Sequence, residues 1–289
     1  MKNNIKQLIK EPSKKIFGVS DPRLLLKQFH TNIRKKIYRE KFGTERLLAL
    51  LDDLGIKQGD TIFVPSSWGE FYNFTDTPQE LISSLKELIG LRGNLAMPSN
   101  TNLFQNNMIF NVRRTPTNAG ILAEYFRRTK GVKRSIHLNS SICIMGPDAE
   151  EMTSTHEKSI TSWDKFSPHH KLYEINAKVV SLGVGHFFTH VSPWHCVDSH
   201  LFRSNEAFRK LYPKKIQYTW EDENKGSGHG ICYVRSAKQN LKYLNRYIKD
   251  VPHSNAQIAN LKVYTTSLKP LIEKGIELGK EGITLYGKI

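Results

Sequence analysis

Cysteines, long apolar runs and acidic residues are all scarce in this chain of 289 residues. Its three cysteines, Cys143, Cys196 and Cys232, are too few and too scattered for a disulfide framework, which favours a reducing compartment. No apolar run approaches the roughly 20 residues of a membrane span. The basic N-terminus also lacks the apolar core of a signal peptide. These absences predict a cytoplasmic protein.

Motifs of several common enzyme classes are missing as well. The chain has no P-loop and no GxGxxG pattern, which argues against kinases, nucleotide hydrolases and dinucleotide-binding enzymes. It also lacks an HExxH motif and paired CxxC motifs, so we expect no metal. The metal alternative rests on six residues with ligand-type side chains: His186, His190, His195, Cys196, Asp198 and His200.

The formal charge is strongly positive, at +16, with 43 Lys and Arg against 27 Asp and Glu. Residues 1–42 hold twelve of the basic residues, including the cluster Arg34-Lys35-Lys36, and only three of the acidic ones. Such a balance fits anionic small molecules, a membrane surface, nucleic acid, or simply a solvated surface. No nucleic-acid-binding motif accompanies the charge, so we expect no nucleic-acid partner. Peripheral association of this segment with a membrane stays open.

Strand and helix patterns alternate along most of the chain, which predicts an α/β sheet with functional residues at strand ends. We expect residues 1–42 to form a basic N-terminal extension and residues 43–289 to form one domain. The expected strands lie at 60–64, 93–97, 142–145 and 178–185. The main expected helices lie at 78–89, 117–128 and 267–279. Thr77 is a typical cap and Pro78 a typical first-turn residue for the earliest of these helices.

His195 and Asp198 are the strongest catalytic candidates. They follow the expected strand at 178–185, and on a helix their spacing places both side chains on one face. A carboxylate beside an imidazole fixes its tautomer and stabilises its protonated form, as a general base requires. The alternative is a His and an Asp in a polar loop or at a helix start. Cys196 is better explained as a buried inert thiol than as a nucleophile.

An acidic cluster at 221–223 stands out in a basic protein. It could form the tip of a hairpin before Lys225 and Gly226. Alternatively, Glu221 could supply a second carboxylate that orients His195 or binds the amine of an acceptor.

Two hydroxyl-rich turns lie at strand or helix ends. One is Pro65-Ser66-Ser67, and the other runs from Arg134 to Ser141 after a helix that closes on arginines. Both could reflect turn chemistry alone. Cations, hydroxyls and backbone N–H groups together also suit a phosphorylated ligand with a reactive carbonyl at its far end, which favours acyl-CoA chemistry.

In order, these segments resemble the aminoglycoside 3-N-acetyltransferase family from about residue 44 to about residue 285. The chain departs from the family pattern at Pro65, Leu138 and Asp198, where the family has histidine, proline and glutamate. The matching segments are Val64-Pro65-Ser66-Ser67-Trp68, Gly93-Asn94-Leu95-Ala96-Met97-Pro98, Gly120 to Arg127, Arg134 to Ser141, Ser167-Pro168-His169-His170-Lys171-Leu172, Leu182-Gly183-Val184, and His195 with Asp198.

The resemblance implies a central mixed β-sheet flanked by helices. It also implies direct transfer from acetyl-CoA or another acyl-CoA to an amine, without a metal. His195 would be the general base, helped by Asp198 and Glu221. Six residues would line the CoA and thioester side of the site: Ser66, Ser67, Arg134, Ser135, His137 and Ser141.

The charge of the chain bears on the acceptor. Aminoglycosides are polycations, and a chain of charge +16 suits an anionic acceptor better. We therefore expect an amino-sugar acceptor linked to a nucleotide, as in polysaccharide biosynthesis. The alternatives are an aminoglycoside acceptor, with antibiotic resistance as the outcome, and a noncatalytic basic binding protein. A homodimer also stays open.

Overall fold

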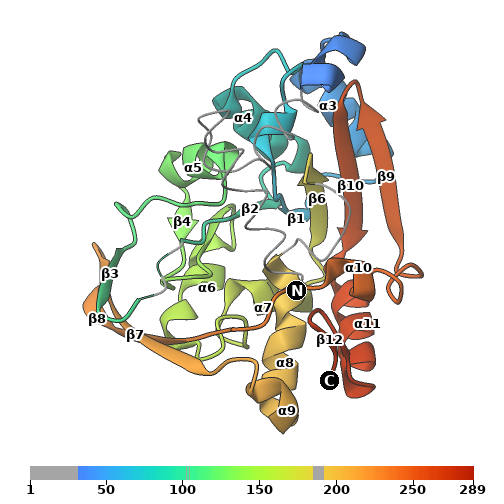
Figure 1. Cartoon of the computed structure of the whole chain (residues 1–289). Helices are drawn as coiled ribbons and strands as arrows, with labels where there is room; N and C mark the ends of the chain where they lie inside the picture. Colours follow the sequence, from blue (N-terminus) through green and yellow to red (C-terminus); the bar gives the residue numbers. More distant parts are fainter. Residues whose placement is uncertain (1–31, 102, 104, 185–191) are drawn as a thin grey trace, which may run out of the picture.

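A seven-stranded mixed sheet forms the centre of the molecule in the computed structural model, which describes residues 32–101, 103, 105–184 and 192–289 (Figure 1). The three central strands β2, β1 and β6 are parallel to one another. On either side, each further strand is antiparallel to its inner neighbour. The predicted α/β fold with a central mixed sheet is confirmed. In sheet order the strands are β4 (Lys133–Arg134), β5 (Ile142–Met145), β2 (Asn94–Pro98), β1 (Thr61–Phe63), β6 (Lys178–Leu182), β10 (Leu261–Ser267) and β9 (His253–Ile258).

Helices cover both faces of this sheet. Successive strand residues point to opposite faces, so Ile62 and Val64 pack in one apolar cluster whereas Phe63 packs in the other. The first cluster includes residues of α3 (Thr44–Asp53), α4 (Pro78–Ile89) and α5 (Ile121–Arg128). The second includes residues of α6 (Ala149–Thr153), α7 (Pro168–Glu174), α8 (Cys196–Ser204) and α11 (Leu268–Lys280). Two short helices, α9 (Glu206–Arg209) and α10 (Leu241–Leu244), follow α8 along the chain.

Some helix and strand ends lie where the sequence predicts them, and others differ. Thr77 and Glu80 form a reciprocal capping box at the start of α4, with Pro78 in the first turn. Helix α5 begins at Ile121, four residues later than predicted, because Thr117 instead donates its hydroxyl to the Asn100 carbonyl. Strand β6 ends at Leu182, before Gly183, whose φ of 71° does not continue an extended strand.

A smaller three-stranded sheet lies beside the main one. It consists of β3 (Met108–Asn111), β7 (Lys214–Asp222) and β8 (Gly226–Val234), and its inner residues pack against Ile136 and Leu138. The segment from Arg134 to Ser141 therefore lies between the two sheets. A third, two-stranded hairpin is formed by β11 (Ile283–Thr284) and β12 (Gly287–Lys288).

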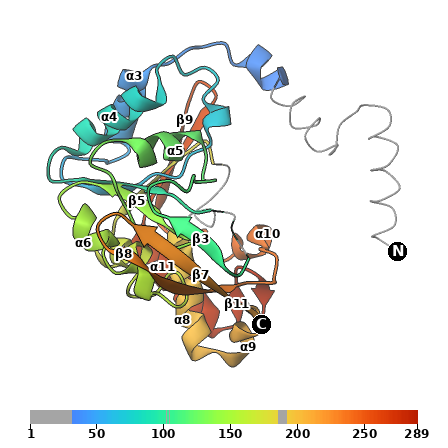
Figure 2. The same ribbon diagram turned by 90° about the vertical axis from the view of Figure 1, so that its left-hand side faces the viewer.

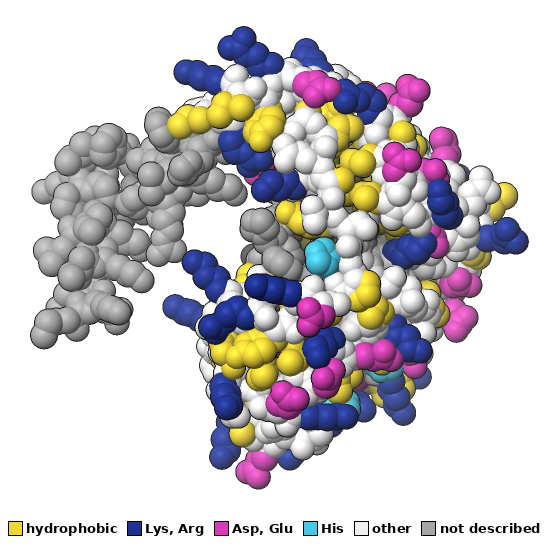
Figure 3. All heavy atoms as spheres, turned by 90° about the vertical axis from the view of Figure 1, so that its right-hand side faces the viewer, with side chains coloured by type: hydrophobic (Ala, Val, Ile, Leu, Met, Phe, Trp, Pro, Cys, Tyr) yellow, Lys and Arg dark blue, Asp and Glu magenta, His cyan; other side chains and the backbone are white. Residues whose placement is uncertain are grey.

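The described part of the N-terminal extension contacts the domain. Residues 32–37 are helical (Figure 2). Arg34 forms an ion pair with Glu70 at 2.8 Å. Residues 1–31 lie outside the described residues. No helix in the part of the chain that is described is both long and apolar enough to cross a membrane. Figure 3 shows that Lys and Arg side chains are spread over the described body and are not confined to the N-terminal extension.

Candidate active site

His195 and Asp198 form a buried hydrogen-bonded pair at the start of α8. Nδ1 of His195 lies 2.6 Å from Oδ2 of Asp198, and the two residues are only 8% and 2% exposed. His195 is the N-cap residue of α8, so Asp198 lies one turn further on the same face. The shorter aspartate therefore reaches the imidazole without loss of contact. Because the carboxylate accepts the proton of Nδ1, Nε2 of His195 is left as the ring acceptor.

Two tyrosines hold the carboxylate of Asp198. The hydroxyls of Tyr212 and Tyr286 lie 2.9 Å and 2.6 Å from its Oδ2 atom and 3.0 Å from each other. Burial and the charge of Asp198 raise the pKa of both tyrosines, so both hydroxyls keep their protons at neutral pH. Oδ2 of Asp198 thus accepts three donors. This network fixes the orientation of the imidazole of His195.

A guanidinium lies on the other side of the imidazole. Nη1 of Arg235 is 3.3 Å from Nε2 of His195 and 3.4 Å from the hydroxyl of Tyr286. Arg235 follows strand β8 directly, so the small sheet supplies it to the site. The indole of Trp163 packs on the same imidazole, with ring centroids 4.5 Å apart.

The thiol of Cys196 points into the core. Cys196 is 4% exposed and belongs to the same apolar cluster as Leu172 and Leu201. Burial, followed by the charge of Asp198, raises the pKa of this thiol well above its ordinary value. The prediction of an inert buried thiol therefore fits its placement.

Close packing of α8 on α11 positions the pair. A Cβ atom at Gly275 would lie 2.6 Å from Val197 and 2.7 Å from Trp194, and one at Gly279 would lie 2.8 Å from Leu201. The two glycines of α11 therefore let the helix carrying Asp198 approach closely. The position of the His195–Asp198 pair depends on this contact.

The guanidinium of Arg134 makes its hydrogen bonds within the chain. Its guanidinium donates to the carbonyl oxygens of Ser99, Val112 and Thr115 at 2.7, 3.0 and 2.5 Å, and it stacks over the ring of Phe110. Burial lowers its pKa to about 10. The donors that we expected to face CoA are engaged with the chain itself, so Arg134 ties the two sheets together.

Three further polar residues of this segment, Ser135, His137 and Ser141, are buried. The hydroxyl of Ser135 lies 2.7 Å from Nδ1 of His156, and that of Ser141 donates to the carbonyl of Ser99 at 2.5 Å. His137 is fully buried and stacks on His156 with ring centroids 4.7 Å apart. We expected Ser135, His137 and Ser141 to line the CoA and thioester side, and the structure places all three out of contact with solvent, between the two sheets.

Buried imidazoles extend from this segment towards His195. The ring of His156 lies 6.0 Å from that of His169 between centroids. Burial lowers the pKa of His156 to about 4, and it also lowers the pKa values of His137 and His169. These three rings are neutral at neutral pH.

Ser66 and Ser67 fit the expected role better. They lie at the carboxyl end of β1, where Ser67 donates its backbone N–H to the carbonyl of Leu182 at the end of β6. Both side chains are partly exposed, and neither hydroxyl has a hydrogen bond to another described residue. The adjacent strand β6 leads along the chain to His195. The ends of two parallel strands thus bring open hydroxyls to the edge of the sheet where ligands usually bind.

Glu221 lies away from His195. It is exposed near the turn end of the β7–β8 hairpin, and it accepts from the amide of Asn111 at 3.0 Å. Arg235 and His195 lie near the opposite end of this hairpin, beside Lys214, about 23 Å along the strand. The structure therefore does not bring Glu221 to the imidazole. The acidic cluster is a hairpin tip, the alternative that the sequence left open.

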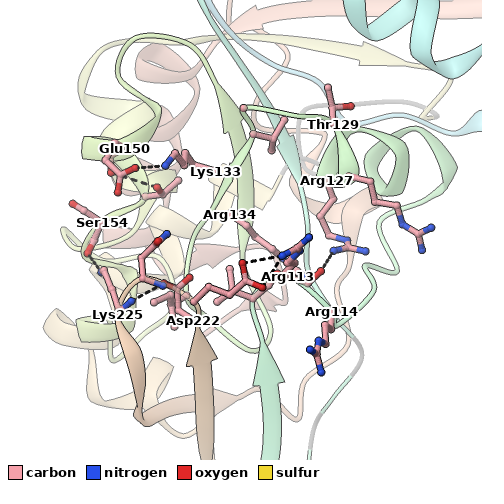
Figure 4. A pocket seen from close by; sticks show the side chains of 18 residues that line it. Arg113, Arg114, Arg127, Thr129, Lys133, Arg134, Glu150, Ser154, Asp222 and Lys225 are labelled. Atoms are coloured by element: carbon pink, nitrogen blue, oxygen red, sulfur yellow. Dashed lines mark hydrogen bonds and ion pairs between the residues drawn. The ribbon is translucent and has the colours of Figure 1, made fainter.

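A basic cleft of about 790 Å³ opens at that tip, between the end of α5, strand β4, helix α6 and the β7–β8 turn (Figure 4). Most of its cations are already paired with carboxylates of the chain. Arg113 pairs with Glu223 at 2.8 Å, and Lys133 pairs with Glu150 at 2.7 Å. This pairing leaves little uncompensated charge for a ligand.

The described residues offer no group of side chains that supports the metal alternative. No group of three or more His, Cys, Asp or Glu residues in the described ranges could hold a metal ion. Two members of the sequence-based metal alternative, His186 and His190, lie outside the described residues.

The sequence did not reveal three residues of the site. Tyr212, Arg235 and Tyr286 come from separate parts of the chain, and none belongs to a recognised motif. The only available signals were a basic residue directly after the short apolar segment at 231–234 and a tyrosine near the C-terminus. Neither signal indicates contact with His195 until the fold is known.

Fold and site together define an α/β enzyme in which an aspartate-supported histidine can act as a base. A family model described as aminoglycoside 3-N-acetyltransferase matches residues 63–278, and the chain belongs to this family. The family expected from the sequence is thereby confirmed.

Among curated relatives, aminoglycoside N(3)-acetyltransferase IV of Salmonella sp. is 31% identical over 142 residues. This match covers 48% of the present chain and 53% of that enzyme, so it spans about half the length of the relative. The solved structure of AAC-IIIb with CoASH has a TM-score of 0.68 at 18% identity, covering 83% of this chain and 97% of that one. A mutant of AAC(3)-IVa in complex with a gentamicin has a TM-score of 0.66 at 20% identity, with coverage of 85% and 92%. The two structural likenesses support the fold.

Proposed function

We propose that this chain transfers an acetyl group from acetyl-CoA to an amine of an amino sugar, with His195 as the general base. The observation that carries the proposal is the 2.6 Å contact between Nδ1 of His195 and Oδ2 of Asp198, which makes Nε2 the acceptor nitrogen of the ring. Family membership supports the reaction type. CoASH in the related AAC-IIIb structure supports acetyl-CoA as the acetyl donor.

The chemistry follows from this arrangement. The neutral amine attacks the carbonyl carbon of the thioester, and a C–N bond forms as the carbonyl oxygen becomes an oxyanion. Nε2 of His195 removes a proton from the attacking nitrogen, and Asp198 stabilises the resulting imidazolium. The C–S bond then breaks, and the imidazolium returns its proton to the sulfur of CoA. Ser66 and Ser67 would bind the CoA side of the site.

For the acceptor, the comparisons favour the aminoglycoside alternative. The named relative is an aminoglycoside acetyltransferase, and the related AAC(3)-IVa mutant is in complex with a gentamicin. They do not support the nucleotide-linked sugar of polysaccharide biosynthesis, which rests on the charge of the chain alone. An aminoglycoside is therefore the first acceptor to test.

The test is release of CoA thiol from acetyl-CoA in the presence of single amines. The panel consists of gentamicin, apramycin, glucosamine and UDP-glucosamine, and product spectra locate the new amide. We expect amine-dependent thiol release with at least one member. If thiol release with every amine is no faster than the hydrolysis of acetyl-CoA alone, the proposal is wrong. Such a result would favour a noncatalytic binding protein.

A further inference from the structure

Trp163 packs its indole on one face of the imidazole of His195. The ring centroids lie 4.5 Å apart, and the ring planes are inclined by 34°. The hydrogen bond from Nδ1 to Asp198 restrains that atom, but the ring can still tilt about it, because the outer torsion of a histidine side chain has only broad minima. An aromatic ring packed on the face opposes this tilt. Trp163 therefore supplies a restraint on His195 that Asp198 alone does not.

Trp163 lies in a tight turn of residues 159–164, which we call the Trp163 turn. Asp164 closes the turn, because its carboxylate accepts from the hydroxyl of Ser159 at 2.9 Å and from two backbone N–H groups of the turn. Ser162 has a φ of 71°, a left-handed conformation that a serine keeps only where its surroundings hold it. The contacts of the Trp163 turn therefore fix its backbone.

The Trp163 turn is anchored on both sides. On one side, the carbonyl oxygen of Ser162 accepts from the hydroxyl of Ser140 at 3.1 Å and lies 3.0 Å from Nε2 of His156. On the other side, the hydroxyl of Thr161 lies 2.5 Å from that of Ser199 in α8. All five residues are buried, so these bonds lie in a low-dielectric interior that strengthens them. The turn therefore connects the buried segment between the two sheets with the helix that carries Asp198.

We propose that Trp163 is a positioning residue for His195, and that the buried segment from Arg134 to Ser141 acts on the reaction through it. The segment holds the carbonyl of Ser162, the turn holds the indole, and the indole keeps the imidazole in the orientation from which Nε2 meets the acceptor amine. This inference rests on the proposed N-acetyl transfer and names a further residue that the transfer needs. It gives the buried polar segment a role other than contact with CoA.

Two substitutions of Trp163 separate a flat ring from mere bulk. The indole N–H makes no hydrogen bond to another described residue, so Trp163→Phe keeps a ring face and loses no bond, whereas Trp163→Leu has no flat face. We expect kcat within about threefold of wild type in Trp163→Phe and about 10-fold lower in Trp163→Leu, since small misplacements of a catalytic group are costly. The KM for acetyl-CoA should stay near the wild-type value in both. Wild-type kcat in Trp163→Leu, or equal losses in both variants, would overturn the inference.

Double-mutant cycles test the route through the indole. Ser140→Ala and Thr161→Val each remove one anchor of the Trp163 turn, and each should lower kcat about threefold in the wild-type protein. Neither should lower it further in Trp163→Leu, because the anchors act through the missing ring. Additive losses would contradict this route. The matched control is Trp220→Leu in the smaller sheet, a tryptophan whose N–H is also without a bond to the described residues, and it should keep wild-type kcat.

Fluorescence tests the contact without the reaction. A protonated imidazole quenches the emission of an indole that it touches, so emission should fall as the pH is lowered and His195 gains a proton. The difference in emission between wild type and Trp163→Phe isolates this indole, and the fall should be missing from His195→Ala. Asp198, Arg235 and His169, which also act on the charge of His195, are the same in all three proteins. An equal fall in all three would contradict the contact.

The two measurements distinguish this inference from the proposed function. If no amine is acetylated but the pH-dependent quenching of Trp163 is present, the proposed function fails and the contact with His195 stands. If transfer occurs but Trp163→Leu keeps the wild-type kcat, the positioning role fails and the proposed function stands.

Discussion

The hydroxyl of Tyr286 lies 2.6 Å from Oδ2 of Asp198, the same oxygen that accepts a hydrogen bond from Nδ1 of His195. These residues are 88 positions apart in the sequence, and the C-terminal β11–β12 hairpin brings Tyr286 into the site. A residue near the end of the chain therefore helps to orient the proposed base. The contact makes the C-terminal hairpin part of the candidate active site.

Tyr286→Phe tests this contact. The phenyl ring keeps the packing on Phe208, but Asp198 loses one of its three donors. A hydrogen bond to a charged group contributes about 1.5–3 kcal/mol, so we expect kcat/KM to fall by about 10-fold or more with little change in fold. Steady-state kinetics measure the effect, with Tyr125→Phe on the surface of α5 as the control. Wild-type kinetics in Tyr286→Phe would show that Tyr286 does not position the pair.

Gly275→Ala tests the packing of α11 on α8. The new methyl group would lie 2.6 Å from Val197 and 2.7 Å from Trp194, so one helix must shift. We expect a loss of about 1–3 kcal/mol in the free energy of unfolding, together with reduced kcat. Denaturant titration and kinetics check both. Gly69→Ala is the control, because a Cβ atom there has no neighbour within 4 Å. An unchanged stability would contradict the close contact.

Arg134→Lys separates a structural role from CoA binding. A lysine cannot reproduce the three hydrogen bonds to the carbonyls of Ser99, Val112 and Thr115, so we expect destabilisation of about 2–4 kcal/mol. Ser67→Ala should do the reverse, weakening CoA binding without loss of stability. Thermal unfolding and calorimetric titration with CoA measure the two effects. A stable Arg134→Lys protein with weak CoA binding would restore Arg134 to the CoA side.

The buried imidazoles predict a pH dependence of stability. The pKa of His156 is lowered to about 4 in the folded protein, against about 6.5 in an unfolded chain, so the unfolded state binds more protons between these values. The contribution of neutral His156 to the free energy of unfolding is therefore complete above pH 6.5. It is lost as the pH falls towards 4, by about 3 kcal/mol.

Thermal melts between pH 4.5 and pH 7.5 check this dependence. His156→Asn should reduce the slope of melting temperature against pH, although it lowers the melting temperature itself. The exposed residue His229 supplies the control, and His229→Asn should keep the wild-type slope. Equal slopes in all three proteins would mean that His156 is not held neutral.

The sequence predicted the framework of the fold because local signals decided it. The capping box at Thr77 and the buried run at Ile142–Met145 both mark elements by nearest neighbours. It also paired His195 with Asp198, because helical spacing alone places them together. The sequence could not predict contacts between distant segments. Tyr286 and Arg235 reach the site through the tertiary fold, while Ser135 and His137 were removed from solvent by the packing of one sheet on another.

The most direct test of the account is the turnover of His195→Ala with acetyl-CoA and the best acceptor from the panel, measured beside CoA binding by calorimetry. We expect kcat/KM to fall about 10²- to 10⁴-fold, as for loss of a general base, while the affinity for CoA stays within about twofold. His200→Ala, an exposed histidine further along α8, should keep wild-type kinetics. A His195→Ala protein that retains near-wild-type turnover would contradict the assignment of His195 as the base.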